Sequence, residues 1–227
     1  ERYEIMPPYH KRLLDDVPKL ARPLKVVVDA GSGVGGPVAP PIFRQLGCQV
    51  WEIACVPDVS FPFHHPDPTV PENLEMLIEK VKHEKADLGI AYDGDGDRAI
   101  FVDAAGRVVD GDAVMLLCAK QMKAEGRLKG NAIVATVMSN IGLEIALRDA
   151  GIEIVRCAVG DKYVMEEMVK RGFSLGGEQS GHVIFSDHLF TGDGLATALN
   201  VLRIMADTGK ELSELAGALV TYPQVLV

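Results

Sequence analysis

An acidic hexapeptide, Asp-Gly-Asp-Gly-Asp-Arg at residues 93–98, lies between two short apolar runs at residues 88–92 and 99–102. Short apolar runs on both sides of a tight polar turn are typical of a strand, a loop and a second strand. The pattern therefore predicts a pair of strands near the middle of the chain, and it places three carboxylates at the end of the first. Any fold of this chain has to accommodate a β-sheet with an acidic edge.

The three aspartates, Asp93, Asp95 and Asp97, would repel one another unless a positive charge lay among them. The glycines between them free the backbone to curl, so that the carboxylate oxygens can converge. Magnesium takes oxygen ligands at about 2.1 Å and usually keeps positions for phosphate or water. We therefore expect a Mg²⁺ site at these three residues, with a solvated hairpin turn as the plain alternative.

Two other acidic motifs do not fit the hexapeptide. A calcium-binding EF-hand loop needs glycine at its sixth position and glutamate at its twelfth, where this chain has Arg98 and Ala104. An aspartyl-phosphate phosphatase motif would need a threonine where Asp97 stands.

Composition narrows the class of protein. The chain has 227 residues, 48% of them hydrophobic, which is enough for one large core or two modest ones. The formal net charge of -9 argues against a nucleic-acid partner and against an anionic membrane surface, since both favour a basic face. The cysteines show no Cys-x-x-Cys spacing, which favours buried thiols in a reducing compartment over zinc sites or disulfides. Without a signal peptide or an apolar run of membrane length, we expect a cytoplasmic location.

Strand and helix patterns alternate along the chain and indicate an α/β protein. Residues 1–20, rich in proline, are expected to be a tail or linker, and the first residue, Glu1, indicates a piece of a longer protein. The loose segment at residues 126–130 marks a boundary between two domains, 21–126 with the acidic loop and 127–227. The second half repeats the order of the first. We therefore expect two consecutive three-layer α/β/α domains with mixed, largely buried sheets.

Several other motifs have two interpretations each. Gly31, Gly33 and Gly36, with Glu52 downstream, match a dinucleotide fingerprint, but Glu52 lies inside its apolar run and not at the end of a strand. Glycines that let a strand turn tightly into a helix are therefore the favoured explanation. An oxidoreductase thus remains an alternative of another class. His64 and His65 are adjacent, so their side chains point apart in an extended segment, which favours loop packing or a minor substrate contact over a metal site.

Two aspartates beyond the hexapeptide and a second polar loop also need an assignment. Asp112 and Asp193 each precede a helical pattern and are expected to cap it, since a carboxylate there satisfies free backbone amides.

The second polar loop is Gly-Glu-Gln-Ser-Gly-His at residues 177–182, between two short apolar runs. Glu178 can accept hydrogen bonds from two neighbouring hydroxyls beside Ser180, and the glycines allow close approach of a sugar ring. Taken alone, this loop is either a ligand-binding loop or a common turn, and His182 either adds a contact or packs.

The two loops, in this order, resemble the metal loop and the sugar-binding loop of the α-D-phosphohexomutases, and the resemblance runs from about Leu24 to the end of the chain. It implies that Glu178 and Ser180 hold the hydroxyls at the 3- and 4-positions of a hexose phosphate. It implies that Arg98 contacts the phosphate. The loop with Asp161 and Lys162 would also face the substrate, where Asp161 could meet a 2-amino group. Lys162 either contacts the substrate or is a solvated lysine at the start of a helix.

In this family a phosphorylated serine of the first domain exchanges its phosphoryl group with the sugar, and magnesium neutralises charge on the transferred group. This chain has no Ser-His-Asn-Pro segment for that serine and no arginine- and serine-rich phosphate clamp. The resemblance therefore implies the two middle domains of a mutase, with N- and C-terminal domains as partners, weak magnesium affinity and no turnover by these residues alone. No nucleic-acid or membrane partner is expected.

The sugar is less closely specified. Residues 134–140, 159–163 and 177–182 are similar to the phosphoglucosamine mutase branch, which converts glucosamine 6-phosphate to glucosamine 1-phosphate. Residues 63–68 are more similar to the phosphomannomutase/phosphoglucomutase branch. A non-catalytic module that binds sugar phosphates is a third hypothesis.

Overall fold

The computed structural model describes residues 6–17 and 19–224, so residues 1–5 and 18 of the predicted tail, and residues 225–227, lie outside the described part. The first half of the chain contains α1 (Met6–Asp16), β1 (Lys25–Asp29), α2 (Ala39–Gln45), β2 (Gln49–Ile53), η1 (Pro71–Leu74), α3 (Glu75–Glu84), β3 (Leu88–Tyr92), β4 (Ala99–Asp103) and β5 (Val108–Val109). The second half contains α4 (Gly111–Ala124), η2 (Lys129–Asn131), β6 (Ala132–Thr136), α5 (Ile141–Asp149), β7 (Glu153–Cys157), α6 (Asp161–Arg171), β8 (Leu175–Gly177), β9 (Val183–Phe185), α7 (Gly194–Thr208) and α8 (Leu212–Ala216). Within the described ranges, no helix combines the length and the apolar composition that a membrane span requires.

The strands form two mixed sheets built on one plan. The first has the order β2-β1-β3-β4-β5 and the second has the order β7-β6-β8-β9. In each, the first three strands are parallel and the next strand is antiparallel, so β1 to β4 correspond to β6 to β9. This repetition confirms the expectation that the second half follows the order of the first. It also places the acidic hexapeptide and the second polar loop at equivalent turns, β3–β4 and β8–β9.

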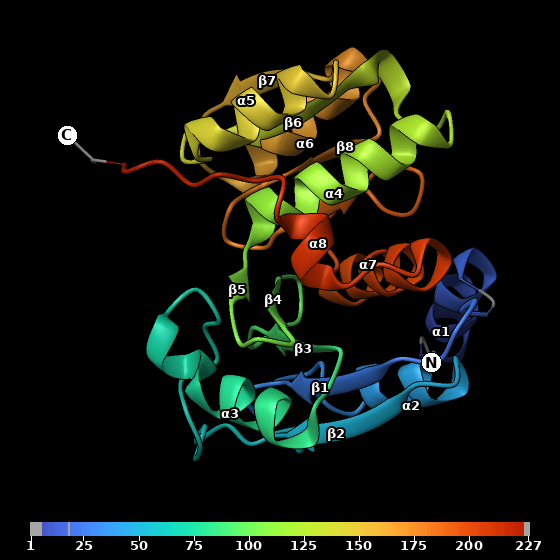
Figure 1. Cartoon of the computed structure of the whole chain (residues 1–227), viewed down its shortest axis with the longest axis vertical. Coiled ribbons are helices and arrows are strands. Elements are labelled where there is room, and N and C mark those ends of the chain that lie inside the picture. Colours follow the sequence, from blue (N-terminus) through green and yellow to red (C-terminus); the bar gives the residue numbers. More distant parts are fainter. Residues whose placement is uncertain (1–5, 18, 225–227) are drawn as a thin grey trace, which may run out of the picture.

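Helices cover both faces of each sheet, as the predicted three-layer α/β/α class requires (Figure 1). On one face of the first sheet, Leu77 and Val81 of α3 pack against Val27. On one face of the second sheet, Val164 and Met168 of α6 pack in the same way. Alternate residues of each strand point to opposite faces. Val26 and Val28, on either side of Val27, therefore point to the other face and enter a separate core.

The opposite faces of the two sheets share one hydrophobic core. Helix α4 follows the first sheet in sequence but contacts β8 and α5 of the second half, whereas α7 follows the second sheet and contacts β4 as well as β9. Figure 1 shows α7 and α8, in red, between the two sheets. The predicted division after residue 126 stays a prediction, and the structure adds that α4, which precedes it, packs on the second sheet. The two halves are therefore joined by the packing of α4 and α7 as well as by the continuous chain.

Part of the predicted tail belongs to this shared core. Leu13 and Val17, in and just after α1, are buried in it. The hydroxyl of Tyr9 donates to the carboxylate of Asp193 at 3.0 Å, and that carboxylate also accepts from the backbone N–H of Ala196 at 2.9 Å. The second contact confirms that Asp193 caps the helix that follows it. Helix α1 is thereby fixed to the start of α7.

The shared core leads to a prediction for Leu199, a residue of α7 that is 1% exposed. Leu199→Ala should lower the free energy of unfolding by about 2–5 kcal/mol, because it removes buried methyl groups and leaves a cavity. Since the core joins both sheets, amide hydrogen exchange should accelerate in β1–β4 and in β6–β9 together.

The matched control is Val169→Ala on the outside of α6, where the side chain is 59% exposed and a change below about 0.5 kcal/mol is expected. Faster exchange in only one of the two sheets of the Leu199 variant would contradict a single shared core.

Candidate functional site

The acidic turn after β3 is closed by its own arginine. Asp93 is buried, and its Oδ1 accepts hydrogen bonds from the backbone N–H groups of Gly96 and Arg98, each at 3.1 Å. Its Oδ2 accepts from Nε of Arg98 at 2.6 Å. Charge-assisted bonds of this kind are stronger than neutral ones, so they fix the shape of the turn.

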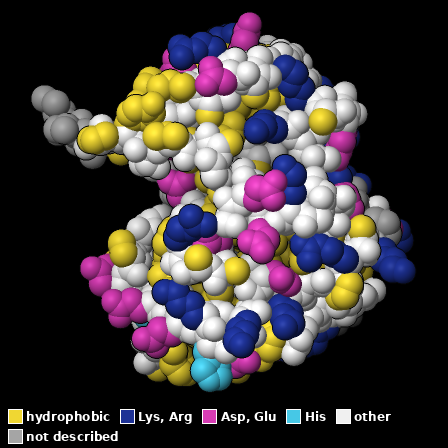
Figure 2. All heavy atoms as spheres, in the orientation of Figure 1, with side chains coloured by type: hydrophobic (Ala, Val, Ile, Leu, Met, Phe, Trp, Pro, Cys, Tyr) yellow, Lys and Arg dark blue, Asp and Glu magenta, His cyan; other side chains and the backbone are white. Residues whose placement is uncertain are grey.

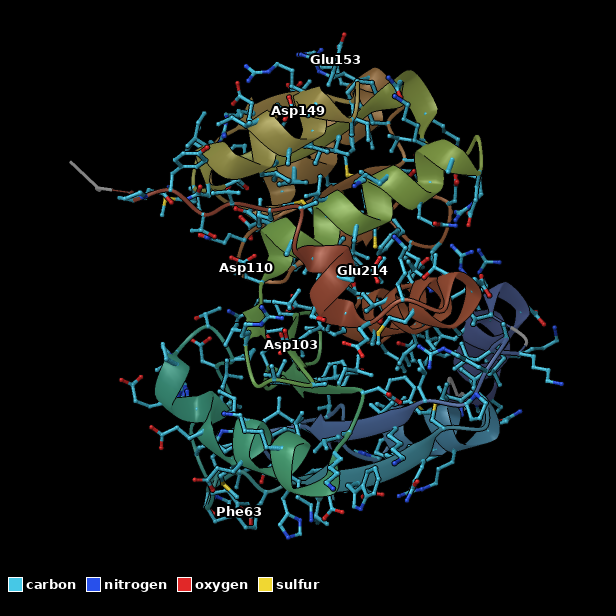
Figure 3. All side chains as sticks on the ribbon, viewed as in Figure 1. Phe63, Asp103, Asp110, Asp149, Glu153 and Glu214 are labelled. Atoms are coloured by element: carbon cyan, nitrogen blue, oxygen red, sulfur yellow. The ribbon has the colours of Figure 1, made fainter. Side chains whose placement is uncertain are left out.

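A second turn of the same build shows which part of the hexapeptide is structural. Asp103, at the other end of β4, accepts from the backbone N–H of Arg107 at 2.9 Å and from its Nε at 2.7 Å (Figure 3). That turn has no further aspartates. The Asp–Arg pair alone is therefore enough to hold such a turn, and Asp95 and Asp97 are not needed for it.

The three aspartates of the first turn do converge, as the sequence predicted. Oxygens of Asp93, Asp95 and Asp97 lie within 4.8 Å of one another. Burial, and next the negative charges of Asp93 and Asp95, raise the pKa of Asp97 to about 7. Like charges at this separation disfavour the ionised form. The cluster therefore has the oxygen donors and the excess negative charge that suit a hard divalent cation.

The second polar loop forms the equivalent turn between β8 and β9. Oε1 of Glu178 accepts a hydrogen bond from the backbone N–H of Gly160 at 3.0 Å, and the backbone N–H of Glu178 donates to the carbonyl of His182 at 2.9 Å. One carboxylate oxygen of Glu178 is thus held by the loop before α6. Among the residues that the structure describes, the other oxygen accepts no backbone hydrogen bond, which leaves it open to a ligand.

The two turns touch. The backbone N–H of Ala99 donates to the carbonyl of Gly181 at 3.2 Å, and Arg98 and His182 form an antiparallel β-bridge. The buried imidazole of His182 places its Nε2 3.5 Å from Oδ2 of Asp97. These contacts bring the metal-binding candidates and the sugar-binding candidates, which are more than 80 residues apart in sequence, into one site.

A cleft of about 680 Å³ opens between the two halves at this junction. In Figure 2 the surface is hollowed between the upper and lower halves. Of the predicted site residues, Arg98, Glu178 and Ser180 line the cleft, whereas Asp161 and Lys162 are exposed at the start of α6 and are not among its lining residues. Other lining residues are Thr69, Ile100, Asp110, Thr136, Met138 and Gln179. The binding roles of all these residues stay predictions.

The glycine-rich turn after β1 supports the acidic turn. A Cβ atom on Gly33 would lie 2.5 Å from the carbonyl oxygen of Gly94, and the next residue, Val34, donates its backbone N–H to that oxygen at 3.0 Å. Glycine is needed there because the two backbones approach so closely. Glu52, the residue that would bind a ribose in a dinucleotide site, instead pairs with Arg44 at 2.5 Å. The tight turn from strand to helix therefore accounts for these glycines.

The proline-rich loop after β2 also contacts residues at the site. His64 places its Nε2 3.0 Å from Oδ2 of the buried Asp29, at the end of β1. Asp67 lies 3.6 Å from Nη1 of Arg98. The neighbouring His65 is exposed. His64 is thus a packing residue of the loop, which was one of its two sequence interpretations.

Sequence reasoning missed Asp110. We expected Asp112 to cap α4, but the cap is Asp110, whose Oδ1 accepts from the backbone N–H of Ala113 at 3.1 Å. Asp112 lies inside the helix, and its Oδ2 accepts from the backbone N–H of Asn140 at 2.7 Å. A carboxylate directly after a strand and before a glycine was the signal that could have identified the cap. Asp110 also lines the cleft.

Comparison with protein families gives two adjoining matches. Residues 7–106 match the family model for phosphoglucomutase/phosphomannomutase, alpha/beta/alpha domain II, and residues 110–222 match the model for domain III of the same family. Curated relatives include phosphoglucosamine mutases of Caldanaerobacter subterraneus, 53% identical, and of Geobacter metallireducens, 49% identical. Each alignment covers 90% of this chain and 45% of the relative. The chain thus spans about half the length of the curated relatives it matches.

Solved structures show the same arrangement. A phosphoglucomutase/phosphomannomutase family protein from Burkholderia thailandensis superposes with a TM-score of 0.90 at 38% identity, covering 97% of this chain and 48% of that one. The N-acetylphosphoglucosamine mutase of Aspergillus fumigatus, solved with GlcNAc-6P and magnesium, superposes with a TM-score of 0.69 at 18% identity, covering 95% of this chain and 54% of that one. At that identity the second likeness shows a shared fold alone.

The His64–Asp29 pair leads to a prediction about pH. The hydrogen bond to Asp29 raises the pKa of His64, although burial acts in the opposite direction. A raised pKa in the folded state means that the pair stabilises the fold below the ordinary histidine pKa and loses this effect as the pH rises through the raised value. His64→Gln should therefore lower the free energy of unfolding more at about pH 6 than at about pH 8.5, measured by urea denaturation.

The exposed His83 offers the same substitution as a control, His83→Gln, with an expected change below about 0.5 kcal/mol at either pH. An equal loss for the His64 variant at both pH values would contradict the ion pair.

Proposed function

Because the chain belongs to the phosphoglucomutase/phosphomannomutase family, of which it carries the α/β/α domains II and III, we propose that it forms the metal- and sugar-binding part of a phosphosugar mutase. The reaction we propose moves a phosphoryl group between the 6- and 1-positions of a hexose phosphate. Relatives named phosphoglucosamine mutase, about half identical to this chain, make glucosamine 6-phosphate the favoured substrate and glucosamine 1-phosphate the product.

One observation carries this proposal, namely the contact between the β3–β4 and β8–β9 turns at the cleft. Arg98 comes from the first turn, and Glu178 and Ser180 come from the second, yet all three line the same cavity. A guanidinium is a planar donor that suits phosphate oxygens, and a carboxylate beside a hydroxyl suits vicinal sugar hydroxyls. A sugar phosphate fits a cleft that offers both, and the turn that carries Glu178 also places Nε2 of His182 3.5 Å from Oδ2 of Asp97.

We propose Mg²⁺ as the cation that Asp93, Asp95 and Asp97 would hold. The donor set fits the ion, since it consists of carboxylate oxygens that repel one another and are close enough to share a ligand. When bound, magnesium neutralises negative charge on a phosphoryl group in transfer. Arg98, fixed by Asp93, orients the phosphate from the side of the same turn.

Glu178 and Ser180 would hold the hydroxyls at the 3- and 4-positions in both halves of the reaction. The hydrogen bond from Gly160 keeps the Glu178 carboxylate in place. Asp161 and Lys162 follow directly after Gly160 and are exposed. They would therefore contact only a part of the substrate that extends out of the cleft.

The phosphoryl donor that we propose is a phosphoserine of a family domain outside this sequence, since the chain matches domains II and III only. The remaining domains would then be its partners, and these 227 residues by themselves should show no mutase turnover. Conversion of glucosamine 6-phosphate by the purified chain would refute this.

Metal binding gives a direct test. Mn²⁺, used as a paramagnetic substitute for Mg²⁺, should bind the chain weakly and compete with Mg²⁺, because the serine phosphate that would complete the ligand set is in another domain. Asp95→Asn should weaken binding by about tenfold or more, since it removes one charged ligand of three and leaves the Asp93–Arg98 pair intact.

Asp149→Asn, at the far end of the second half (Figure 3), removes the same charge elsewhere and should leave the metal affinity unchanged. Equal affinities for the wild-type chain and the Asp95 variant would rule out this metal site.

The activity itself is testable in the longest natural polypeptide that contains this sequence. It should convert glucosamine 6-phosphate with a higher kcat/KM than mannose 6-phosphate. Glu178→Ala should lower kcat/KM by about 10- to 100-fold, because a charged hydrogen bond to the substrate is lost. Glu153→Ala, at the exposed start of β7, is the control and should have no effect.

Preference for mannose 6-phosphate would place the protein in the phosphomannomutase branch. Binding of sugar phosphates without turnover by that polypeptide would favour a non-catalytic module instead.

A further inference from the structure

Two carboxylates line the cleft among the residues that the structure describes, Asp110 and Glu178. Asp110 directly follows β5 and caps α4, where the chain crosses from the first half to the second. Figure 3 labels it at the first turn of α4, on the side where the two halves part. The side chain is partly exposed and therefore accessible to a ligand in the cleft.

The carboxylate of Asp110 is fixed against the sugar-binding loop. Its Oδ1 accepts from the backbone N–H of Ala113 at 3.1 Å, and its Oδ2 accepts from Nε2 of Gln179 at 3.2 Å. The next residue, Gly111, donates its backbone N–H to the carbonyl of Gln179 at 3.0 Å. A Cβ atom on Gly111 would lie only 2.0 Å from the carbonyl oxygen of Glu178, so only glycine permits this approach. The Asp110 carboxylate and the loop that carries Glu178 are thus held together by one side-chain and one backbone hydrogen bond.

The negative charge of Asp110 is not neutralised by these partners. Both donors are uncharged amides. The arginine that lines the same cleft, Arg98, pairs instead with Asp93 at 2.6 Å and lies 3.6 Å from Asp67. Asp110 therefore presents to the cleft a carboxylate that has no cation among these partners, and a carboxylate group with a negative charge only accepts hydrogen bonds.

We propose that Asp110 determines specificity by receiving the ammonium group of an amino sugar phosphate, while Glu178 and Ser180 bind its hydroxyls. This inference rests on the proposed function and assigns the recognition of the amino group within it. A carboxylate distinguishes an ammonium from a hydroxyl by charge, and an ammonium offers only donors, which matches a group that only accepts.

Asp161, to which the family resemblance gave this contact, is less suited to it. Its side chain is exposed, does not line the cleft, and its Oδ1 accepts from the backbone N–H of Lys162 at 2.7 Å. Asp110 has the opposite properties. It lines the cleft, and its carboxylate accepts a hydrogen bond from Gln179, the residue between Glu178 and Ser180.

The test is an NMR titration of the 227-residue chain with glucosamine 6-phosphate, glucose 6-phosphate and N-acetylglucosamine 6-phosphate. These ligands place an ammonium, a hydroxyl and an uncharged amide at the same ring position. The wild-type chain should bind the first about fivefold more tightly than the second, the factor expected for one partly exposed charge pair. It should bind the third no more tightly than the second.

Asp110→Asn should reduce this ratio to about one, because an uncharged amide no longer favours an ammonium over a hydroxyl. Asparagine is as good a helix cap as aspartate, so α4 should remain intact, and Asp110→Ser provides a second variant that still caps. Asp149→Asn removes one negative charge outside the cleft and should retain the wild-type ratio.

A wild-type ratio of one, or a preference for glucosamine 6-phosphate that survives in both Asp110 variants, would overturn the assignment while leaving the proposed function intact. If none of the three ligands shifts the NMR signals of Arg98 and residues 178–182, the proposed function is overturned, and the assignment with it.

Discussion

The backbone contact between the β3–β4 turn and the β8–β9 turn is the constraint on which the rest of the site depends. The N–H of Ala99 bonds to the carbonyl of Gly181, and His182 lies against Asp97. On the other side, the first N–H of α7, that of Gly194, donates to the carbonyl of Gly96 at 3.0 Å. If these contacts were broken, the three aspartates would remain a local acidic turn and the Glu178 loop would remain a glycine-rich turn. Together they bring the three aspartates next to a cleft that Arg98, Glu178 and Ser180 line.

The repeated topology explains why these two turns meet. Each half places a polar turn after its third strand, where the sheet changes from parallel to antiparallel. Exchange of α4 and α7 between the halves then holds the two sheets around one core, with the equivalent turns facing each other. The two equivalent turns carry different side chains. The first carries the aspartates that we propose for a cation, and the second carries Glu178 and Ser180, which we propose for a sugar.

Local features of this molecule could be predicted from the sequence, and features that depend on which elements meet could not. The bounds of β3 and the convergence of Asp93, Asp95 and Asp97 follow from residues that are neighbours in the chain. By contrast, α4 lies next to the first sheet in sequence and packs on the second, which no periodicity reveals. The same limit hid Asp110, since its place beside Gln179 depends on that packing. His64 had two open interpretations because its partner, Asp29, is 35 residues away.

The central claim is that the acidic turn and the Glu178 loop form one site, and paramagnetic relaxation tests it most directly. Mn²⁺ added to the isotopically labelled chain should broaden the backbone amide signals of residues 93–98 and, to a similar extent, those of residues 178–182. Excess Mg²⁺ should reverse both effects together. Broadening confined to residues 93–98, with the signals of Glu178 and His182 unchanged, would show that the two loops act separately and would contradict the account.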